Sequence, residues 1–294
     1  MINKLAIVGL GLIGGSLARA LKKQGVVGEV IGTGRREASL IKARELGVID
    51  RWTLDLGEAV AEADIVVIAT PTLVAEQVLA DLKPYMRPDL IVTDVASVKG
   101  SLVEAARTIF GELPRQFVPG HPIAGSEQSG VEASRDDLYI NHRVILTPCD
   151  STDEAAVSTI RTMWESTGAE VLQMPVDEHD RVLAATSHLP HVLAYALVDA
   201  LASDGSAEAI FRFAAGGFRD FTRIASSDPV MWHDIVRANR DAVLASLDEF
   251  TAGLDALRSA IASDNSADIL ATFERAKKAR DEHFLTQYAI KSGD

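Results

Sequence analysis

Short apolar runs alternate with helical patterns over the first 175 residues of the chain. Residues 5–8 are apolar and end at Gly9, and from residue 13 to residue 21 the apolar positions change to helical spacing. Further apolar runs follow, and helical stretches separate most of them: 30–32, 65–69, 90–93, 143–146 and 169–174. Strands that are apolar on both faces and alternate with helices are typical of a parallel sheet that is covered by helices.

The pattern changes after Pro175, where the strand signal disappears. From Asp177 onward the chain is rich in Ala, Leu, Arg, Asp and Glu at helical spacing, and Asp228 before Pro229 predicts the start of a helix. We therefore predict two domains: an α/β domain with a doubly wound parallel sheet in residues 1–175, and an all-α domain in residues 176–294.

An apolar seam follows one side of a long predicted helix near the C-terminus. Its residues are spaced four, three, four, three and four apart: Val243, Leu247, Phe250, Leu254, Leu257 and Ile261. Such a seam needs a partner helix. The pattern alone favours neither packing within the chain nor a second copy, and of the two we predict a homodimer through the C-terminal helices.

Charge and cysteine content restrict the partners and the compartment. The 294 residues carry a formal net charge of −13, so we expect neither nucleic acid nor an anionic membrane as a main partner. Local arginines still allow a small anionic substrate. Cys149 is the only cysteine, which excludes an intrachain disulfide, and no uninterrupted apolar run reaches the roughly 18 residues that span a bilayer. We expect a cytoplasmic protein.

Three glycines follow the first predicted strand. Gly9, Gly11 and Gly14 form the pattern Gly-x-Gly-x-x-Gly between a strand and a helix. In a Rossmann-type domain the first glycine permits a tight turn, the second lets the backbone approach a pyrophosphate, and the third lets helix and strand pack closely. The start of the helix, with Leu12 and Ile13, offers N–H groups and a partial positive charge to that pyrophosphate. We therefore predict a dinucleotide site here.

The end of the second predicted strand bears on the choice of cofactor. An Asp or Glu at this point holds the ribose 2′-hydroxyl of NAD, whereas residues 32–36 read Gly-Thr-Gly-Arg-Arg. Thr33, Arg35 and Arg36 can surround a 2′-phosphate with charge-assisted hydrogen bonds, which favours NADP. NAD is the alternative cofactor, because arginines in loops are often only solvated and then contact no 2′-phosphate. We assign Thr70 and Pro71, directly after the predicted strand at 65–69, to the same cofactor site.

Four further motifs follow in order. They are Thr-Asp-Val-Ala-Ser-Val-Lys-Gly at 93–100, Gly-His-Pro-Ile-Ala-Gly-Ser-Glu at 120–127, Ser-His-Leu-Pro-His at 187–191 and Gly-Gly-Phe-Arg-Asp-Phe-Thr-Arg at 216–223. With these motifs and the glycine pattern, the chain from Gly9 to Trp232 resembles the prephenate/arogenate (cyclohexadienyl) dehydrogenase family. The resemblance implies the oxidative decarboxylation of prephenate, arogenate or both with NAD(P)+, giving 4-hydroxyphenylpyruvate or tyrosine, in tyrosine biosynthesis.

The resemblance also implies roles for single residues. His121 is the base that takes the hydroxyl proton as hydride leaves the carbinol carbon, and a neutral imidazole suits that work at neutral pH. Ser97 matches the serine that hydrogen-bonds this histidine and the cofactor region. Arg223 matches the arginine that binds the ring carboxylate. His191 matches a histidine that contacts the substrate, and Trp232 matches a residue that lines the pocket.

We also assign Arg219, Ser126 and Glu127 to the substrate site. If the segment 216–223 is helical, Arg219 shares a face with Arg223 and can pair with Glu127 at the mouth of the pocket. The phenylalanines beside the two arginines predict a partly buried setting for both.

Most of the other histidines receive no role: His142, His179, His233 and His283. His188 and His191 lie three residues apart, as two metal ligands on one helix face would. No third ligand lies nearby in the sequence, so we expect no metal.

Two other functions stay open. A β-hydroxyacid or imine-reducing dehydrogenase also combines a Rossmann domain with a helical dimerisation domain. Those enzymes usually rely on a lysine in the helical domain, and residues 176–232 contain none. The other is a dinucleotide-sensing protein without turnover, and the acidic chain argues against one that binds DNA.

Overall fold

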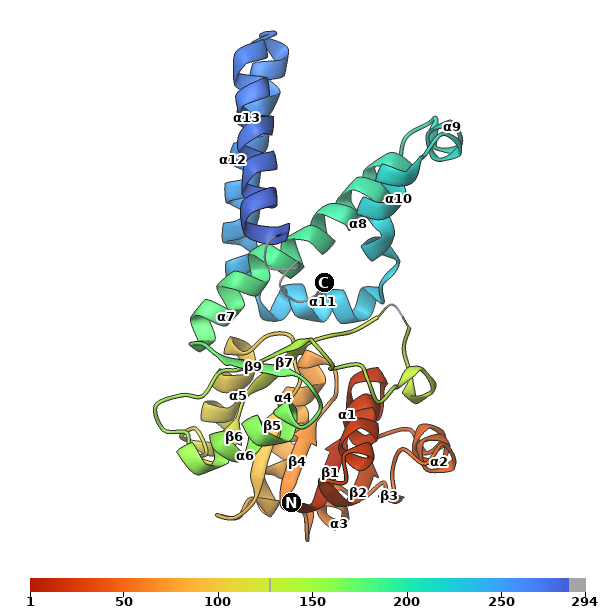
Figure 1. Cartoon of the computed structure of the whole chain (residues 1–294), viewed down its shortest axis with the longest axis vertical. Coiled ribbons are helices and arrows are strands. Elements are labelled where there is room, and N and C mark those ends of the chain that lie inside the picture. The colour runs from red at the N-terminus through yellow and green to blue at the C-terminus, as the bar shows by residue number, and fades with distance from the viewer. Residues whose placement is uncertain (127, 286–294) are drawn as a thin grey trace. The chain divides into compact units, whose positions relative to one another are not determined.

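The computed structural model describes residues 1–126 and 128–285 (Figure 1). Its strands are β1 (Ile2–Val8), β2 (Val27–Thr33), β3 (Arg51–Thr53), β4 (Ile65–Ile68), β5 (Ile91–Asp94), β6 (Phe117–Val118), β7 (Gly120–Ile123), β8 (Arg143–Leu146) and β9 (Glu170–Gln173). Its α-helices are α1 (Leu12–Lys23), α2 (Glu37–Glu45), α3 (Leu56–Val60), α4 (Thr72–Leu82), α5 (Gly100–Phe110), α6 (Glu154–Glu165), α7 (Val176–Leu183), α8 (Leu189–Ala202), α9 (Ala207–Arg212), α10 (Gly216–Thr222), α11 (Pro229–Ala238), α12 (Arg240–Ala262) and α13 (Ser266–Ala279).

Six parallel strands form the main sheet in the order β3-β2-β1-β4-β5-β6. The order reverses at β1, because β2 and β4 pair with its two edges: Leu5 lies opposite Val30 on one side and Ile65 on the other. This is the doubly wound Rossmann-type arrangement, so the predicted fold class is confirmed. Ligands of such sheets bind at the carboxyl ends of the strands where the order reverses, which here is the end of β1.

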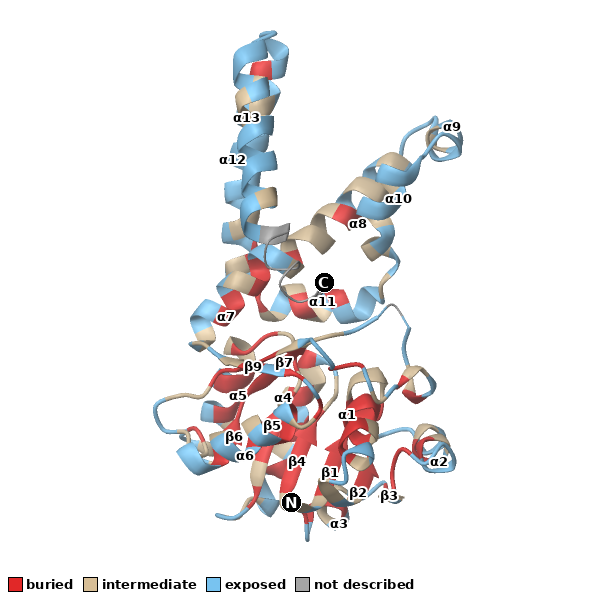
Figure 2. Ribbon diagram, viewed as in Figure 1, coloured by how far each residue is buried: buried red, intermediate tan, exposed pale blue. Residues whose placement is uncertain are grey.

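Helices cover both faces of this sheet, as the alternation along β1 shows. Leu5 and Ile7 pack into a core with α1, α2 and α6, whereas Ala6 and Val8 pack into a core with α3, α4 and α5. All four side chains are at most 5% exposed, and Figure 2 shows buried residues concentrated in the strands. A strand with two buried faces is a continuous apolar run in the sequence, which is why the pattern predicted it.

A second sheet, in the order β7-β8-β9, corrects part of the prediction. The runs at 143–146 and 169–174 were expected in the main parallel sheet. Instead β8 pairs with β9 in parallel and with β7 in antiparallel orientation. The chain leaves the main sheet at Pro119, between β6 and β7, and proline has no N–H to continue a ladder of hydrogen bonds. No strand was predicted at β7, which carries His121.

In the described residues only helices and turns follow β9. The predicted helix start is confirmed, because Asp228 caps α11 by accepting the N–H groups of Val230 at 2.8 Å and Met231 at 3.3 Å. Internal contacts divide the chain into two compact units, residues 1–240 and 241–294. They do not bear on the boundary between 175 and 176, which stays a prediction. None of the described helices has the length and apolar character that crossing a membrane requires.

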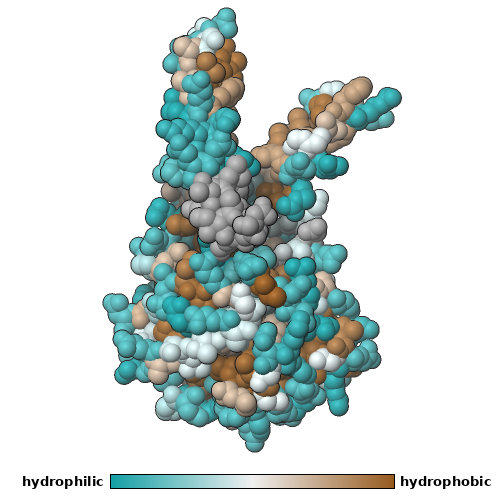
Figure 3. Space-filling view, viewed as in Figure 1, coloured by the Kyte–Doolittle hydropathy of each residue, from teal (hydrophilic) through white to brown (hydrophobic). Residues whose placement is uncertain are grey.

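The second unit consists, in its described residues, of α12 from Asp241 onward, α13 and a last π-helical turn at Arg280–Leu285. Phe250, Leu254 and Ile261 of the predicted seam are between 39% and 59% exposed. Leu270 and Phe273 on α13 are exposed as well. Figure 3 shows hydrophobic atoms on the surface near the tip of this hairpin. The described part of the unit thus leaves much of the apolar seam uncovered.

Candidate active site

The turn between β1 and α1 has the shape of a dinucleotide cradle. A Cβ built on Gly9, whose φ is +97°, would lie 2.7 Å from the carbonyl oxygen of Ala69. A Cβ on Gly14 would lie 2.5 Å from the carbonyl oxygen of Gly9, so no side chain fits at either position. A Cβ on Gly11 would meet no atom of the residues described within 4 Å. The first and third glycines therefore serve the fold, and the second leaves space for a ligand.

The start of α1 faces this space with unsatisfied groups. Gly11 is the N-cap, no side chain of the described residues caps the helix, and the first helical turn contains no acidic residue. The first N–H groups of a helix have no partner within it, and they carry the positive end of the helix dipole. The Tyr139 hydroxyl donates to the carbonyl oxygen of Ile13 at 2.6 Å and fixes this turn. A pyrophosphate fits these groups.

The end of β2 and the end of β4 supply further polar groups. Thr33 is 2% exposed, whereas Arg35 and Arg36 are exposed, and neither arginine has an ion-pair partner among the described residues. Thr70 lies beside Gly9, and its hydroxyl is buried without a hydrogen-bond partner in the part of the chain described. A bound dinucleotide could satisfy such a hydroxyl. Pro71 is exposed at the start of α4.

His121 lies on β7, opposite Ile145 of β8, and is 9% exposed. Its Nδ1 lies 2.9 Å from Nε2 of His179 on α7, and the two rings meet edge to face with centroids 5.1 Å apart. Its Nε2 has no hydrogen-bond partner among the described residues. No role for His179 was predicted from the sequence, so this contact is a finding of the structure.

Asp180, the next residue on α7, binds the other side of the His179 ring. Its Oδ1 lies 2.7 Å from Nδ1 of His179 and accepts the N–H of Lys99 at 2.9 Å, while its Oδ2 accepts the N–H of Gly100 at 2.7 Å. Burial raises the pKa of Asp180, but these hydrogen bonds outweigh burial, and the pKa lies below its usual value. The carboxylate is therefore ionised at neutral pH.

Lys99 is a fully buried cation beside the same site. Its Nζ forms an ion pair with Asp94 at the end of β5 and donates to the carbonyl oxygen of Gly120 at 2.7 Å, directly before His121. Asp94 also accepts the N–H of Ala96 at 2.8 Å. Burial raises the pKa of Asp94 and lowers that of Lys99, and their ion pair opposes both shifts. The pair joins the end of β5 to the start of β7.

Burial also sets the protonation of the two histidines in contact. It lowers the pKa of His121 well below its usual value of 6.5, and the neighbouring His179, Lys99 and His188 lower it further. Burial lowers the pKa of His179 as well, although the hydrogen bond to Asp180 opposes this shift. Both rings are therefore neutral at neutral pH, and a neutral imidazole can accept a proton.

Ser97 is half-buried in the loop between β5 and α5. The structure differs here from the expectation, because the described residues contain no hydrogen bond between Ser97 and His121. His179 occupies Nδ1 of that ring instead. The role of Ser97 stays a prediction.

His191 and Trp232 form a stacked pair, with ring centroids 3.4 Å apart and planes inclined by 18°. Nδ1 of His191 lies 2.9 Å from the carbonyl oxygen of Ser187, one helical turn earlier. Trp232 is 9% exposed, and its indole N–H is buried without a partner among the described residues. His188 lies edge to face with the same indole, with centroids 6.2 Å apart. The structure thus brings these predicted pocket residues together.

Arg223 begins the short turn after α10 and is exposed. Burial lowers the pKa of His191, the hydrogen bond to Ser187 opposes this shift, and the positive charge of Arg223 adds to it. Arg219 is 82% exposed and lies 3.7 Å from Asp220. The partly buried setting expected for both arginines is wrong for this chain, because α10 contains no buried residue and Phe221 is itself 49% exposed.

Ser126 is exposed, and its hydroxyl oxygen accepts the N–H of Gln128 at 3.2 Å. Glu127, and with it the expected pairing to Arg219, lies outside the described residues. Within residues 1–126 and 128–285, no group of three or more His, Cys, Asp or Glu side chains is placed to hold a metal ion.

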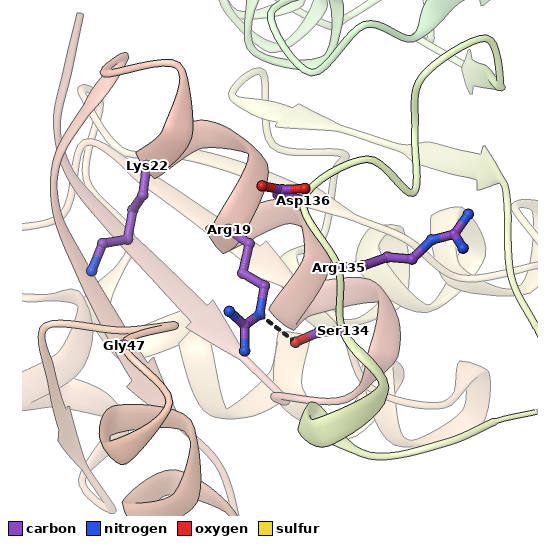
Figure 4. A pocket seen from close by; sticks show the side chains of 6 residues that line it. All are labelled: Arg19, Lys22, Gly47, Ser134, Arg135 and Asp136. Atoms are coloured by element: carbon purple, nitrogen blue, oxygen red, sulfur yellow. Dashed lines mark hydrogen bonds between the residues drawn. The ribbon is translucent and has the colours of Figure 1, made fainter.

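A surface pocket lies beside α1 (Figure 4). Its lining residues are Arg19, Lys22, Gly47, Ser134, Arg135 and Asp136. The guanidinium of Arg19 donates to the Ser134 hydroxyl at 2.9 Å. Lys22 and Arg135 pair with carboxylates, so this pocket offers no free charge from either residue. None of the residues predicted for the site lines this pocket.

Three groups that support His121 were not predicted from the sequence: His179, Asp180 and Lys99. Lys99 belongs to a motif quoted for the resemblance, but nothing in its pattern predicts burial. The dipeptide His-Asp occurs on helices both at 179–180 and at 233–234. Only the first lies against His121, and the sequence contains no signal that separates the two.

Comparisons with known proteins agree with this arrangement. The chain matches the model of the prephenate dehydrogenase nucleotide-binding domain over residues 17–173 and that of the prephenate dehydrogenase dimerization domain over residues 175–275. It is 41% identical over 283 residues to the cyclohexadienyl dehydrogenase of Zymomonas mobilis, a match that covers 95% of this chain and 96% of that protein.

Solved structures show the same relationship. The prephenate dehydrogenase of Aquifex aeolicus, in complex with hydroxyphenyl propionate and NAD+, superimposes with a TM-score of 0.90 at 37% identity, covering 96% of this chain and 98% of that one. The arogenate dehydrogenase of Synechocystis superimposes with a TM-score of 0.81 at 31% identity, covering 95% and 99%. Motif order, fold and these matches over nearly the whole length lead to one conclusion: the chain belongs to the prephenate dehydrogenase family.

Proposed function

We propose that the protein catalyses the oxidative decarboxylation of prephenate, arogenate or both with NAD(P)+, in tyrosine biosynthesis. The observation that carries this proposal is His121, a buried imidazole that is neutral at neutral pH and whose Nε2 is free of partners among the described residues. The names of the Zymomonas and Aquifex proteins support the substrate class, and the arogenate dehydrogenase of Synechocystis supports arogenate as a second substrate.

His121 acts in the chemical step as a general base. A bound nicotinamide dinucleotide supplies the acceptor for hydride. Nε2 of His121 takes the proton of the substrate hydroxyl as the electron pair of the C–H bond leaves the carbinol carbon. The bond to the ring carboxylate then breaks, CO2 leaves, and the released electron pair completes the aromatic ring. Because aromatisation drives the second step, the main task of the protein is to position the substrate.

The cradle at the end of β1 fits a dinucleotide. The open space at Gly11, the uncapped start of α1 and the orphaned hydroxyl of Thr70 are the features that support this assignment. We assign NADP as the preferred cofactor, because Arg35 and Arg36 follow β2 where an NAD site carries an acid. In the double variant Arg35→Ala/Arg36→Ala, kcat/KM for NADP should fall by roughly tenfold and that for NAD should change little.

The substrate carboxylate is assigned to Arg223, and the stacked pair of His191 and Trp232 is assigned to the wall of the pocket. Arg219, Ser126 and Glu127 stay assigned to its mouth. Replacement of Arg223 by Ala should chiefly raise KM for the substrate, because it removes binding energy that the ground state already uses.

A homodimer is the proposed assembly. The match to a dimerization domain and the exposed apolar side chains Phe250, Leu254 and Ile261 support it. Light scattering on the purified protein should give twice the mass of one chain. The variant Leu254→Glu should give a lower mass. The cytoplasm is the proposed compartment, in keeping with the single cysteine, Cys149.

One assay tests the activity. Prephenate and arogenate are each combined with NAD and with NADP, and absorbance of the reduced cofactor is followed. Lack of turnover in all four combinations, with dinucleotide binding retained, would favour the dinucleotide-sensing protein instead. His121→Asn should abolish turnover while the affinity for the dinucleotide is kept.

A further inference from the structure

A continuous chain of hydrogen bonds leads from the proposed base to a carboxylate. Nδ1 of His121 lies 2.9 Å from Nε2 of His179, and Nδ1 of His179 lies 2.7 Å from Oδ1 of Asp180. His179 is fully buried, and His121 and Asp180 are each 9% exposed. Water therefore competes little for these bonds. The three ring nitrogens that form them each have one partner.

The bonds determine where the protons lie. The ionised carboxylate of Asp180 can only accept, so Nδ1 of His179 carries a hydrogen. A neutral His179 then has a lone pair on Nε2 and must accept from His121. Nδ1 of His121 is therefore protonated, and its lone pair is on Nε2, the nitrogen without a partner among the described residues.

We propose that His179 and Asp180 are positioning residues for the reaction: Asp180 fixes the tautomer of His179, and His179 holds His121 so that Nε2 accepts the substrate proton. This inference rests on the proposed function, in which His121 is the base. The logic is that of other enzymes in which a buried carboxylate orients a catalytic imidazole, here with a second imidazole between the two.

The surrounding charges make this support necessary. The groups that face His121 are His179 from α7, His188 from the π-helical turn Ala184–His188, and the buried ammonium of Lys99 before α5. Asp94 lies behind Lys99, and Asp180 lies behind His179. Lys99 disfavours a positive charge on His121. The N–H of Nδ1, donated to His179, is then the contact that stabilises the imidazolium once the proton has arrived.

The chain contains a natural contrast to this pair. On α11, Nδ1 of His233 lies 2.9 Å from Oδ1 of Asp234, the same dipeptide with the same bond. The side chain of His233 is 58% exposed, and no ring contact is found for it among the described residues. His233→Gln is therefore the matched control for variants of His179.

The tautomer can be measured in the free protein. Long-range 1H–15N correlation spectra of the full-length protein with 15N-labelled histidine, at about pH 7.5, separate protonated from unprotonated ring nitrogens. His121 is identified by the signals that His121→Asn loses. The proposal expects a hydrogen on Nδ1 and none on Nε2, for His121 and for His179. A hydrogen on Nε2 of His121 would overturn it.

Kinetics test whether the positioning matters. His179→Phe removes the acceptor and should lower kcat by on the order of 100-fold, with KM within about twofold of the wild type. His179→Gln provides an oxygen that can accept from Nδ1 of His121 and should recover much of this loss. His233→Gln should leave kcat unchanged. A kcat for His179→Phe close to that of the wild type, or a folded Gln variant no better than the Phe variant, would contradict the proposal.

The two measurements separate this inference from the function on which it rests. An inactive wild-type protein would refute the proposed function and leave the tautomer as measured. An active wild-type protein with the opposite tautomer would refute only the roles of His179 and Asp180. If both His179 variants fail to fold, as their melting curves would show, the spectra of the wild type still decide the proposal.

Discussion

Acid should destabilise this protein through His188, whose surroundings suit only the neutral ring. The side chain is 1% exposed, and its Nδ1 accepts from the side-chain amide of Asn239 at 3.1 Å. The same amide nitrogen donates to the carbonyl oxygen of Asp180 at 2.8 Å. A proton on Nδ1 of His188 would therefore face an N–H group. Burial lowers the pKa of His188 from 6.5 to about 4, with Asp180 opposing the shift and the histidines His179 and His191 adding to it.

The size of the effect follows from the two pKa values. In the unfolded chain the ring takes up its proton near pH 6.5, and in the folded protein near pH 4. The contribution of the neutral His188 ring to the free energy of unfolding is fully present above pH 6.5. It is lost as the pH falls, because the unfolded state binds the proton first. The shift corresponds to about 3 kcal/mol in full. At pH 5 the loss is about 2 kcal/mol.

Urea unfolding of His188→Gln at about pH 8 and pH 5 measures this contribution. Glutamine does not titrate, and its oxygen can accept from Asn239. The free energy of unfolding of the wild type should fall between the two pH values by about 2 kcal/mol more than that of the variant. The cost of the substitution itself cancels in this difference. Protein concentration is held constant, because an oligomer gains stability with concentration.

His233→Gln serves as the control for replacing a histidine by glutamine, because the side chain of His233 is 58% exposed. Equal pH dependence in the wild type and in His188→Gln would refute the reasoning, since burial would then not keep His188 neutral.

Three other measurements test the cradle, the base and the buried ion pair. Gly14→Ala should lower Tm, because its Cβ has no room, whereas Gly11→Ala should keep Tm and weaken dinucleotide binding; equal losses of Tm would contradict this. The kcat/KM of the wild type should stay constant from pH 8 through 6.5 and fall only well below, since the neutral form of His121 is the base and its pKa is lowered; a midpoint at 6.5 or above would disagree. Lys99→Met should cost about 3–5 kcal/mol by leaving Asp94 unpaired, and adding Asp94→Asn should restore part of it; no recovery would argue against the ion pair.

The main sheet was predictable because its strands are buried on both faces. Such strands appear as uninterrupted apolar runs, and β1 and β4 are examples. The second sheet was not predictable, because β7 is a short strand that contains Pro122 and its partner β8 begins only at Arg143. Local patterns carry no information on which strands pair across such distances.

The residues of the proposed site also differ in whether the sequence could predict them. Gly9, Gly11 and Gly14 act through their own backbone, so spacing alone indicated them. His121 could be predicted only through the motif at 120–127. His179 and Asp180 could not be found by either route, because their setting is created by the packing of α7 against β7 and the start of α5. The same dipeptide occurs on α11, where the side chain of His233 is 58% exposed.

The buried ammonium of Lys99 also bears on when activity can arise. It is satisfied only after the end of β5 and the first residue of β7 have both reached it, and the N–H of Lys99 is bound by Asp180 from 81 residues later. Three distant stretches must therefore assemble before the imidazole next to Gly120 is in place. A nascent or partly refolded chain should thus be inert, and recovery of turnover after denaturation should lag behind recovery of helical circular dichroism.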